Sequence, residues 1–261
     1  MTARGHSADF IQSLERGLLV INSFSGENPG QTLSEVAEHT GLTRATARRV
    51  LLTLAELGYV DQRGRSFALT PKVLELGYSF LSSLRVVDVA QPSMERLVDQ
   101  VQESSSMSVL NGPDIVYVAR VPTKRIMTIA LALGSRLPAY PTSMGRVLLA
   151  GLADEELEEA IERTDLEELT PHTVTDRERF RELIHQCREE GFALVDQELE
   201  EGVRSIAAPI RNRRGEVIAA MNVSCHASRV DIEGMHEVFK PKLLETAAEI
   251  NERIRGLAVR I

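Results

Sequence analysis

Three arginines lie close together near the start of a short amphipathic segment, residues 43–57. On a helix of this length, Arg48 and Arg49 point to one side and Arg44 lies at the edge of that sector. Guanidinium groups bind phosphate oxygens and can pair bidentately with guanine edges in the major groove of DNA. The spacing therefore indicates DNA recognition, although a surface helix with three solvated arginines would show the same pattern. The opposite side carries the apolar residues at helical spacing, Ala47, Val50, Leu51, Leu54 and Leu57.

The elements expected around this segment favour DNA binding. Two helical runs precede it, at residues 11–21 and 33–40. Thr43 is a suitable N-cap for the arginine-bearing helix, and Gly58 stops that helix. Two short strand-like runs follow and are joined by a tight turn at Arg63-Gly64. Helix, helix, turn, helix and hairpin is the order of a winged helix-turn-helix.

We expect the DNA contacts to come from the first turns of this helix and from the tip of the hairpin. The first-turn amide groups behind Thr43 can meet a phosphate, and Ala45 can touch a thymine methyl group. Arg63 and Arg65 at the hairpin tip can reach the DNA backbone or the minor groove. The expected DNA-binding residues are Thr43, Arg44, Ala45, Thr46, Arg48, Arg49, Arg63 and Arg65.

The charge of the chain is uneven along its 261 residues. The whole chain has a formal net charge of −8. Residues 1–85 contain nine basic and eight acidic residues, so the acidic excess lies behind them. A near-neutral segment can still bind DNA if its cations share one face, because attraction to phosphate is local. Two domains with different partners are therefore the natural interpretation.

Composition excludes several classes of protein. The content of 43% hydrophobic and 26% charged residues is ordinary for a globular protein. No apolar run approaches the roughly 20 residues of a membrane span, and the polar start lacks the apolar core of a signal peptide. Two cysteines cannot form a disulfide framework. We expect a reduced, cytoplasmic protein without a membrane partner.

Thr70-Pro71 opens a further helix, with Thr as N-cap and Pro at the first helical position. Its apolar face would come from Val73, Leu76, Phe80 and Leu84. We expect three parts. These are a winged helix-turn-helix domain at 1–70, a linker helix at 71–85 and a second domain at 86–261.

The second domain mixes strands and helices without strict alternation, so the fold class is α+β. Helices are expected at 92–103, 143–151, 154–163, 175–191 (with a capping box of Thr175 and Glu178) and 233–254, the last interrupted at Pro241. Strands are expected at 106–110, 115–121, 127–133, 192–195, 205–210 and 217–224.

Catalytic and metal motifs are missing from the sequence. It contains no nucleophile elbow, HExxH motif, P-loop or GxGxxG turn. Cys187 lies far from the adjacent Cys225 and His226, which is not a zinc spacing, and the acidic run 154–168 lacks EF-hand spacing. We expect no catalytic residues, metal or cofactor. An enzyme with a vestigial DNA-binding front, or an architectural DNA binder without a ligand, are the alternatives; the long second domain argues against the latter.

The chain resembles transcriptional regulators of the isocitrate-lyase-regulator (IclR) family over nearly its whole length. The front matches in SLERGLLVINSF, LSEVAEHTGLTRATARRVLLTLAELGYV and FALTPKVLELG. The back matches in GSRLPAYPTSMGRVLLAGL, GFALVDQELEEGVRSIAAPI and VIAAMNVSCHASR. The segments ESSSMSVLNGPDIVYVARVPTKRIM, PAYPTSMGRVLLAGL and VDQELEEGVRSIAAPI most resemble the subgroup that regulates the β-ketoadipate pathway of aromatic-acid breakdown.

This resemblance implies a GAF-like effector-binding domain behind the linker helix. It implies a small organic acid as effector, with protocatechuate and β-ketoadipate as the typical signals of the subgroup. A regulator of another catabolic pathway with a different ligand is the alternative. The resemblance also implies a homodimer, with a homotetramer as a further possibility, on a palindromic or repeated double-stranded DNA operator.

The resemblance carries the ligand contacts of the family over to four places in the second domain. A helix start at Thr142 is a suitable seat for a carboxylate. A bound acid also needs a cation, for which Arg204 is the first candidate and Arg120 the second. The family more often has Ser where this chain has Asn222. The expected effector-binding residues are Thr142, Ser143, Met144, Gly145, Asp196, Arg204, Ser205, Asn222 and Ser224.

Overall fold

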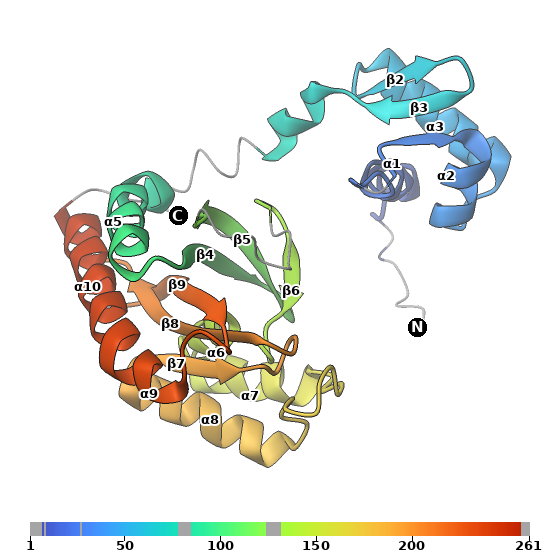
Figure 1. Ribbon diagram of the computed structural model, residues 1–261. Helices are drawn as coiled ribbons and strands as arrows, with labels where there is room; N and C mark the ends of the chain where they lie inside the picture. Colours follow the sequence, from blue (N-terminus) through green and yellow to red (C-terminus); the bar gives the residue numbers. More distant parts are fainter. Residues whose placement is uncertain (1–6, 8, 27, 78–84, 124–131, 257–261) are drawn as a thin grey trace. The chain divides into compact units, whose positions relative to one another are not determined.

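The computed structural model describes residues 7, 9–26, 28–77, 85–123 and 132–256. The chain divides into two compact units, residues 1–82 and 83–261, which are called here the N-terminal and C-terminal units (Figure 1). Within the described ranges, no helix is long and apolar enough to cross a membrane.

The N-terminal unit is a winged helix-turn-helix. Its sheet has the order β1-β3-β2 with antiparallel pairing, and Phe67 and Val60 from the sheet join the buried face of the helices. The three-residue β1 lies between the first two expected helices, where no strand is predicted because so short a strand leaves no periodicity in sequence. The elements are α1 (Gln12–Asn22), β1 (Gly30–Thr32), α2 (Leu33–Thr40), α3 (Arg44–Glu56), β2 (Val60–Arg63) and β3 (Ser66–Leu69).

Local capping fixes the turn between α2 and α3. Thr32 and Glu35 form a capping box at the start of α2, and Gly41 ends it in the left-handed region at φ 65°. The Thr43 hydroxyl accepts a hydrogen bond from the Thr46 amide at 3.2 Å, as the sequence predicted. These caps set where α3 begins and so which of its residues face outward.

The expected linker helix is only partly visible. Residues 71–73 form a 3₁₀ turn capped by Thr70, and residues 74–77 are helical. Residues 78–84, which include Phe80 and Leu84, lie outside the described part of the chain.

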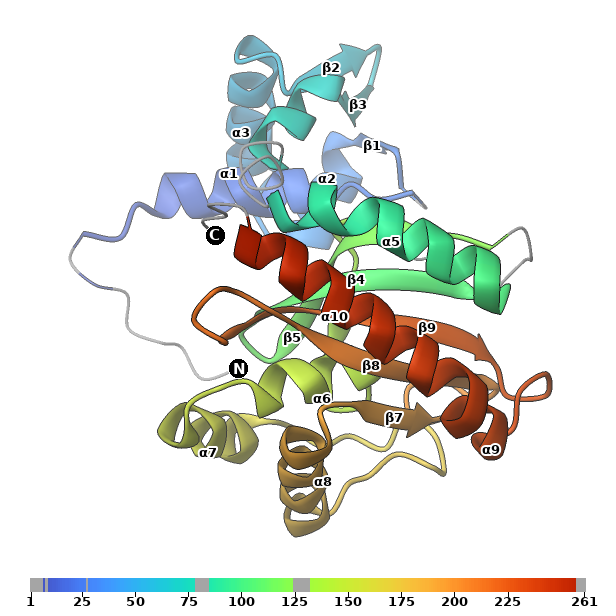
Figure 2. The same cartoon turned by 90° about the vertical axis from the view of Figure 1, so that its left-hand side faces the viewer.

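The C-terminal unit is an antiparallel six-stranded sheet of order β6-β5-β4-β9-β8-β7 with helices on both faces (Figures 1 and 2). Helices α5 (Arg85–Val101) and α10 (Lys240–Gly256) cover one face. Helices α6 (Ser143–Ala150), α7 (Asp154–Arg163) and α8 (Arg177–Glu190) pack on the other. The strands are β4 (Ser104–Asn111), β5 (Asp114–Val121), β6 (Arg136–Pro138), β7 (Ala193–Asp196), β8 (Val203–Arg211) and β9 (Val217–His226).

Some expected boundaries in this unit are wrong. Helix α5 already includes the described residues from Arg85 onward, so Pro92 lies inside it instead of at its start. Asp176, and not Thr175, caps α8 by accepting from the Arg179 amide at 2.7 Å. The last helix follows the short α9 (Ile232–Gly234) and a π-helical turn (Met235–Phe239), and α10 begins just before Pro241. Of the expected strand at 127–133, residues 127–131 lie outside the described part, and residues 132 and 133 are not strand.

Candidate functional site

Helix α3 separates a buried face from a charged one. Ala47 and Leu51 are fully buried in the core of the N-terminal unit, while Arg44, Arg48 and Arg49 are exposed. Within the described chain, none of these three guanidinium groups takes part in an ion pair or a hydrogen bond. A packed underside therefore presents free cations to the outside, together with the exposed Ala45 and the half-buried Thr46.

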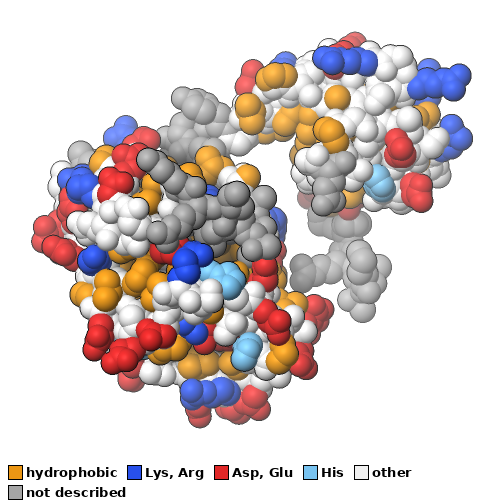
Figure 3. All heavy atoms as spheres, viewed as in Figure 1, with side chains coloured by type: hydrophobic (Ala, Val, Ile, Leu, Met, Phe, Trp, Pro, Cys, Tyr) orange, Lys and Arg blue, Asp and Glu red, His pale blue; other side chains and the backbone are white. Residues whose placement is uncertain are grey.

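The wing arginines differ in their surroundings. Arg63 pairs with Asp61 at 3.0 Å, but both side chains are exposed, so the pair is weak and easily exchanged for a phosphate contact. Arg65 is also exposed. In Figure 3, Lys and Arg side chains gather at one end of the N-terminal unit and hydrophobic side chains gather near its other end. The unit therefore offers two different surfaces.

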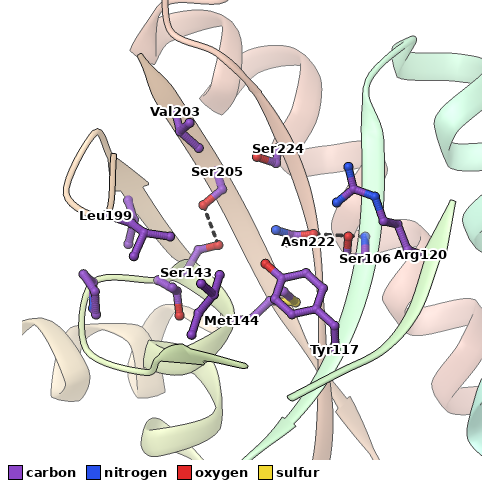
Figure 4. Close-up of a pocket in the computed structure, with 14 residues that line it drawn as sticks. Ser106, Tyr117, Arg120, Ser143, Met144, Leu199, Val203, Ser205, Asn222 and Ser224 are labelled. Carbon is purple, nitrogen blue, oxygen red and sulfur yellow. Dashed lines mark hydrogen bonds between the residues drawn. The ribbon is translucent and has the colours of Figure 1, made fainter. Parts of the chain in front are cut away.

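A small cavity that opens to the surface lies between the sheet and the start of α6 in the C-terminal unit (Figure 4). Thr142 caps α6 by accepting from the Gly145 amide at 3.0 Å, and the hydroxyl groups of Ser143 and Ser205 lie 2.8 Å apart. The lining comprises Ser106, Tyr117, Arg120, Leu137, Pro141, Thr142, Ser143, Met144, Val195, Leu199, Val203, Ser205, Asn222 and Ser224.

A β-bulge in β5 sets one wall of this cavity. Ser108 of β4 pairs with Tyr117, but Met107 pairs with Ala119, so Val118 is an extra residue in β5. Side chains of a regular strand alternate between faces, so residues 117 and 120 would point to opposite sides. The bulge restores a common side, and both Tyr117 and Arg120 line the cavity.

Arg120 lies beside polar groups of the neighbouring strands. It is opposite Ser106 in β4, which is opposite Asn222 in β9. The Asn222 Oδ1 atom accepts a hydrogen bond from the Ser106 amide at 3.0 Å, which leaves its NH₂ group to face the cavity (Figure 4). The Arg120 guanidinium is half-buried and has no hydrogen-bond or ion-pair partner among the described residues. Two donors without protein acceptors therefore meet at this wall.

The structure places Arg204, the first candidate cation, away from the cavity. Its guanidinium is buried, donates to both carboxylate oxygens of Asp196, at 2.7 and 2.9 Å, and donates to the Val230 carbonyl. Neither Arg204 nor Asp196 lines the cavity. The two residues are direct cross-strand partners in the β7–β8 hairpin. The cation at the cavity is instead Arg120.

Some of the other residues expected to contact the ligand line the cavity and one does not. Gly145 does not line the cavity, because it is the contact point of α6 with the preceding loop. A Cβ atom there would lie 2.0 Å from the Ala139 carbonyl oxygen. The residues that do line the cavity are Thr142, Ser143, Met144, Ser205, Asn222 and Ser224. Whether they bind a ligand stays a prediction.

Sequence reasoning missed Tyr117 and Ser106 among the polar lining residues. An alternating pattern on β4 could have indicated Ser106, since Ser104, Ser106 and Ser108 share one face. The bulge at Val118 leaves no such pattern on β5. Burial raises the pKa of Tyr117 to about 12, and the nearby Arg120 opposes this shift. Tyr117 therefore stays a neutral phenol at physiological pH.

A buried ion pair holds the cavity wall of α6 against the loop after β7. The guanidinium of Arg146 donates to Glu198 at 2.6 Å, and both side chains are almost fully buried. The Val174 amide and the Thr173 hydroxyl also bond to Glu198. The next residue, Leu199, lines the cavity. The pair thus fixes two sides of the cavity relative to each other.

Two family models match the chain and together cover most of it. The model described as the IclR helix-turn-helix domain matches residues 13–64. The model described as the bacterial transcriptional regulator IclR C-terminal region matches residues 78–252.

Individual relatives agree with these matches. The Pca regulon regulatory protein of Pseudomonas putida is 43% identical over 249 residues, which span 95% of this chain and 86% of that protein. The crystal structure of a Rhodococcus sp. RHA1 protein described as a transcriptional regulator is 53% identical and superposes with a TM-score of 0.84, covering 95% of this chain and 99% of that one.

An IclR homologue from Microbacterium hydrocarbonoxydans, solved in complex with 4-hydroxybenzoate, superposes with a TM-score of 0.82 at 27% identity. That alignment covers 94% of this chain and all of the other. The winged helix-turn-helix, the free arginines of α3, the cavity and these relatives lead to one conclusion: the chain belongs to the IclR family of bacterial transcriptional regulators and is a regulator, not an enzyme.

Proposed function

We propose that this regulator is controlled by an aromatic carboxylic acid that binds in the cavity of the C-terminal unit. The observation that carries the proposal is the Arg120 guanidinium, which has no partner among the described residues and lies beside the free NH₂ group of Asn222. A buried carboxylate needs a cation or several donors, and guanidinium can supply two parallel hydrogen bonds. The remaining walls include Met144, Leu137 and Val195, which suit an apolar ring.

The comparisons support this ligand class. The relative from Microbacterium hydrocarbonoxydans carries 4-hydroxybenzoate, and the Pseudomonas putida relative is a regulator of the Pca regulon. The subgroup resemblance names protocatechuate (3,4-dihydroxybenzoate) and β-ketoadipate, of which the first has the ring that these walls fit.

The test is a calorimetric titration of the full chain with 3,4-dihydroxybenzoate, with its amide as a neutral analogue of the same shape. The acid is expected to bind and the amide to bind at least about 10-fold more weakly, because only the acid can form a charge-assisted pair with Arg120. Equal affinities for acid and amide would contradict the role of Arg120. If the protein bound β-ketoadipate and not the aromatic acid, the effector would be an open-chain acid.

We propose that residues 1–70 bind the operator, that residues 71–85 connect the units, and that residues 86–261 bind the effector. The exposed Arg44, Arg48 and Arg49 of α3 support the first part, since they are free to contact bases and phosphates. Thr43, Ala45 and Thr46 lie on the same first turns, and Arg63 and Arg65 on the wing. Since its target is DNA, we place the protein in the cytoplasm.

We further propose that the protein acts as a homodimer through the N-terminal unit. An apolar groove lies between α1 and α3, and Leu14 and Leu18 of α1 are 59% and 48% exposed. Leu57 and Leu76 line the same groove and are also exposed. Contiguous exposed apolar patches mark interaction sites, and a second copy would place two recognition helices on a symmetric operator.

A further inference from the structure

The hydroxyl group of Tyr117 lacks a protein partner. The residue is only 4% exposed and lines the cavity. Within the described ranges, no side chain or backbone group bonds to its hydroxyl, and Ser105 Oγ is the one completely enclosed side-chain polar atom without a partner. The Tyr117 oxygen is therefore not sealed in the core but opens onto the cavity. A ligand that fills the cavity must therefore form a hydrogen bond with the Tyr117 hydroxyl.

Tyr140 is a comparable buried tyrosine whose hydroxyl has a hydrogen-bond partner within the chain. It is also 4% exposed, but its hydroxyl donates to the Glu167 carbonyl at 2.8 Å, and it does not line the cavity. Buried tyrosine hydroxyls normally find a partner of this kind. The hydroxyl of Tyr117 has no such partner among the described residues, which indicates that its partner comes from outside the chain.

The hydroxyl of Tyr117 and the guanidinium of Arg120 lie at different places on the cavity wall that β5 forms (Figure 4). In Figure 4 the tyrosine ring reaches into the cavity with its hydroxyl directed toward α6, where Ser143 lies. The Arg120 guanidinium lies on the side of Ser106 and Asn222. A ligand whose carboxylate meets Arg120 would therefore present another part of its ring to Tyr117.

We propose that Tyr117 is a specificity-determining residue, whose hydroxyl hydrogen-bonds a ring hydroxyl group of the effector and so selects hydroxylated aromatic acids over benzoate. The assignment rests on the proposed function of the cavity. A phenol both donates and accepts, so it can pair with a ring hydroxyl in either direction. An effector with a bare ring would leave the Tyr117 hydroxyl desolvated and unpaired, which is costly.

The experiment combines one change in the protein with one change in the ligand. Full-length wild type, Tyr117→Phe and Tyr140→Phe are titrated calorimetrically with 3,4-dihydroxybenzoate and with benzoate. Wild type is expected to bind the dihydroxy acid at least about 10-fold more tightly than benzoate. Tyr117→Phe should lose most of this preference through weaker binding of the dihydroxy acid, with benzoate affinity changed less than about threefold. The matched control Tyr140→Phe should keep the preference.

Two results would overturn the assignment, and they are distinguishable. If wild type prefers the dihydroxy acid and Tyr117→Phe retains that preference, Tyr117 is not the selector, although the cavity still binds aromatic acids. If wild type binds neither acid, the proposed function fails and the assignment fails with it.

A third comparison needs no variant and covers the case in which Tyr117→Phe does not fold. Wild type is titrated with 3,4-dimethylbenzoate, which has similar size but no hydroxyl groups. It should bind at least about 10-fold more weakly than 3,4-dihydroxybenzoate. Equal affinities would overturn the proposal.

Discussion

Val118 decides which side of β5 Arg120 faces. Without this extra residue, the guanidinium would lie among the apolar side chains between the sheet and α5, a costly place for an unpaired charge. With it, Arg120 lines a cavity whose walls combine hydroxyls, an amide and apolar side chains. The bulge explains why strand alternation in the sequence could not identify Tyr117.

The expected site residues that line the cavity are those chosen for their local position, and two that lie away from it have side chains that pair elsewhere. The start of a helix at Thr142 and Ser143 was predicted correctly, and both residues line the cavity. Arg204 lies away from the cavity and is neutralised by Asp196, its partner across the β7–β8 hairpin. Partners of this kind come from strand register, which the sequence specifies only once the hairpin has been placed.

Arg204→Ala should lower the stability of the C-terminal unit. The substitution removes two bonds to Asp196 and one to a backbone carbonyl in a buried setting, so we expect a loss of roughly 3 kcal/mol in the free energy of unfolding. Urea unfolding measures it, and ligand affinity at a temperature where the variant is folded should remain. Unchanged stability together with lost ligand binding would return Arg204 to the binding site.

Arg48→Ala should weaken operator binding by roughly 1–3 kcal/mol if the guanidinium reads a base. The side chain is exposed on α3, so the fold should not change. The measurement is an operator titration at fixed salt with a non-specific duplex beside it. Arg163→Ala, an exposed arginine of the C-terminal unit, is the control and should bind as wild type. If Arg48→Ala bound the operator as tightly as wild type, another residue of the helix would have to read the base.

At the scale of elements, the sequence predicted most of the fold through its stops and caps. Gly41 and Gly191 end helices in the left-handed region, and Thr43 caps α3 as expected. Pro92 misled because proline favours helix starts, and here it lies inside α5. Thr175 misled because Asp176, one residue later, is an equally good cap. The missed strands β1 and β6 have three residues each, too few for a pattern.

Helix α6 depends on a close approach that only glycine allows. Gly145→Ala would place a methyl group 2.0 Å from the Ala139 backbone oxygen, so helix and loop would have to separate. We expect a loss of several kcal/mol in unfolding free energy and weaker ligand binding, because the first turn of α6 carries Thr142 and Ser143. Thermal unfolding measures the first effect.

Gly256→Ala is the control for this substitution, since a Cβ atom there meets nothing within 4 Å at the end of α10. It should leave the unfolding temperature of the C-terminal unit within about a degree or two of wild type. A Gly145→Ala protein as stable as this control would show that α6 can shift without cost, and the rigid cavity wall would have to be abandoned.

At the scale of the whole molecule, regulation requires the ligand and the operator to influence each other. If the acid changes operator affinity by some factor, the operator must change the affinity for the acid by the same factor. In the proposed domain organisation, residues 71–85 would carry this coupling.

The groove of the N-terminal unit predicts how copies assemble. Leu18→Asp should weaken self-association, because it places a charge in an exposed apolar surface between α1 and α3. Sedimentation equilibrium should show a larger dissociation constant than for wild type, and operator binding should weaken in parallel. Asp substituted for Leu133, an exposed leucine of the C-terminal unit, is the control. Undiminished association of Leu18→Asp would move the dimer contact elsewhere.

The most direct test of the account is the affinity of the Arg120→Gln protein for 3,4-dihydroxybenzoate. Calorimetry would compare it with wild type and with Arg163→Gln, which removes an exposed arginine on α7. The account predicts that Arg163→Gln binds as wild type, while Arg120→Gln, still folded and still able to bind operator DNA, loses at least about 10-fold in affinity for the acid. An Arg120→Gln protein that bound the acid as tightly as wild type would contradict the assignment of this cavity as a carboxylate site built around Arg120.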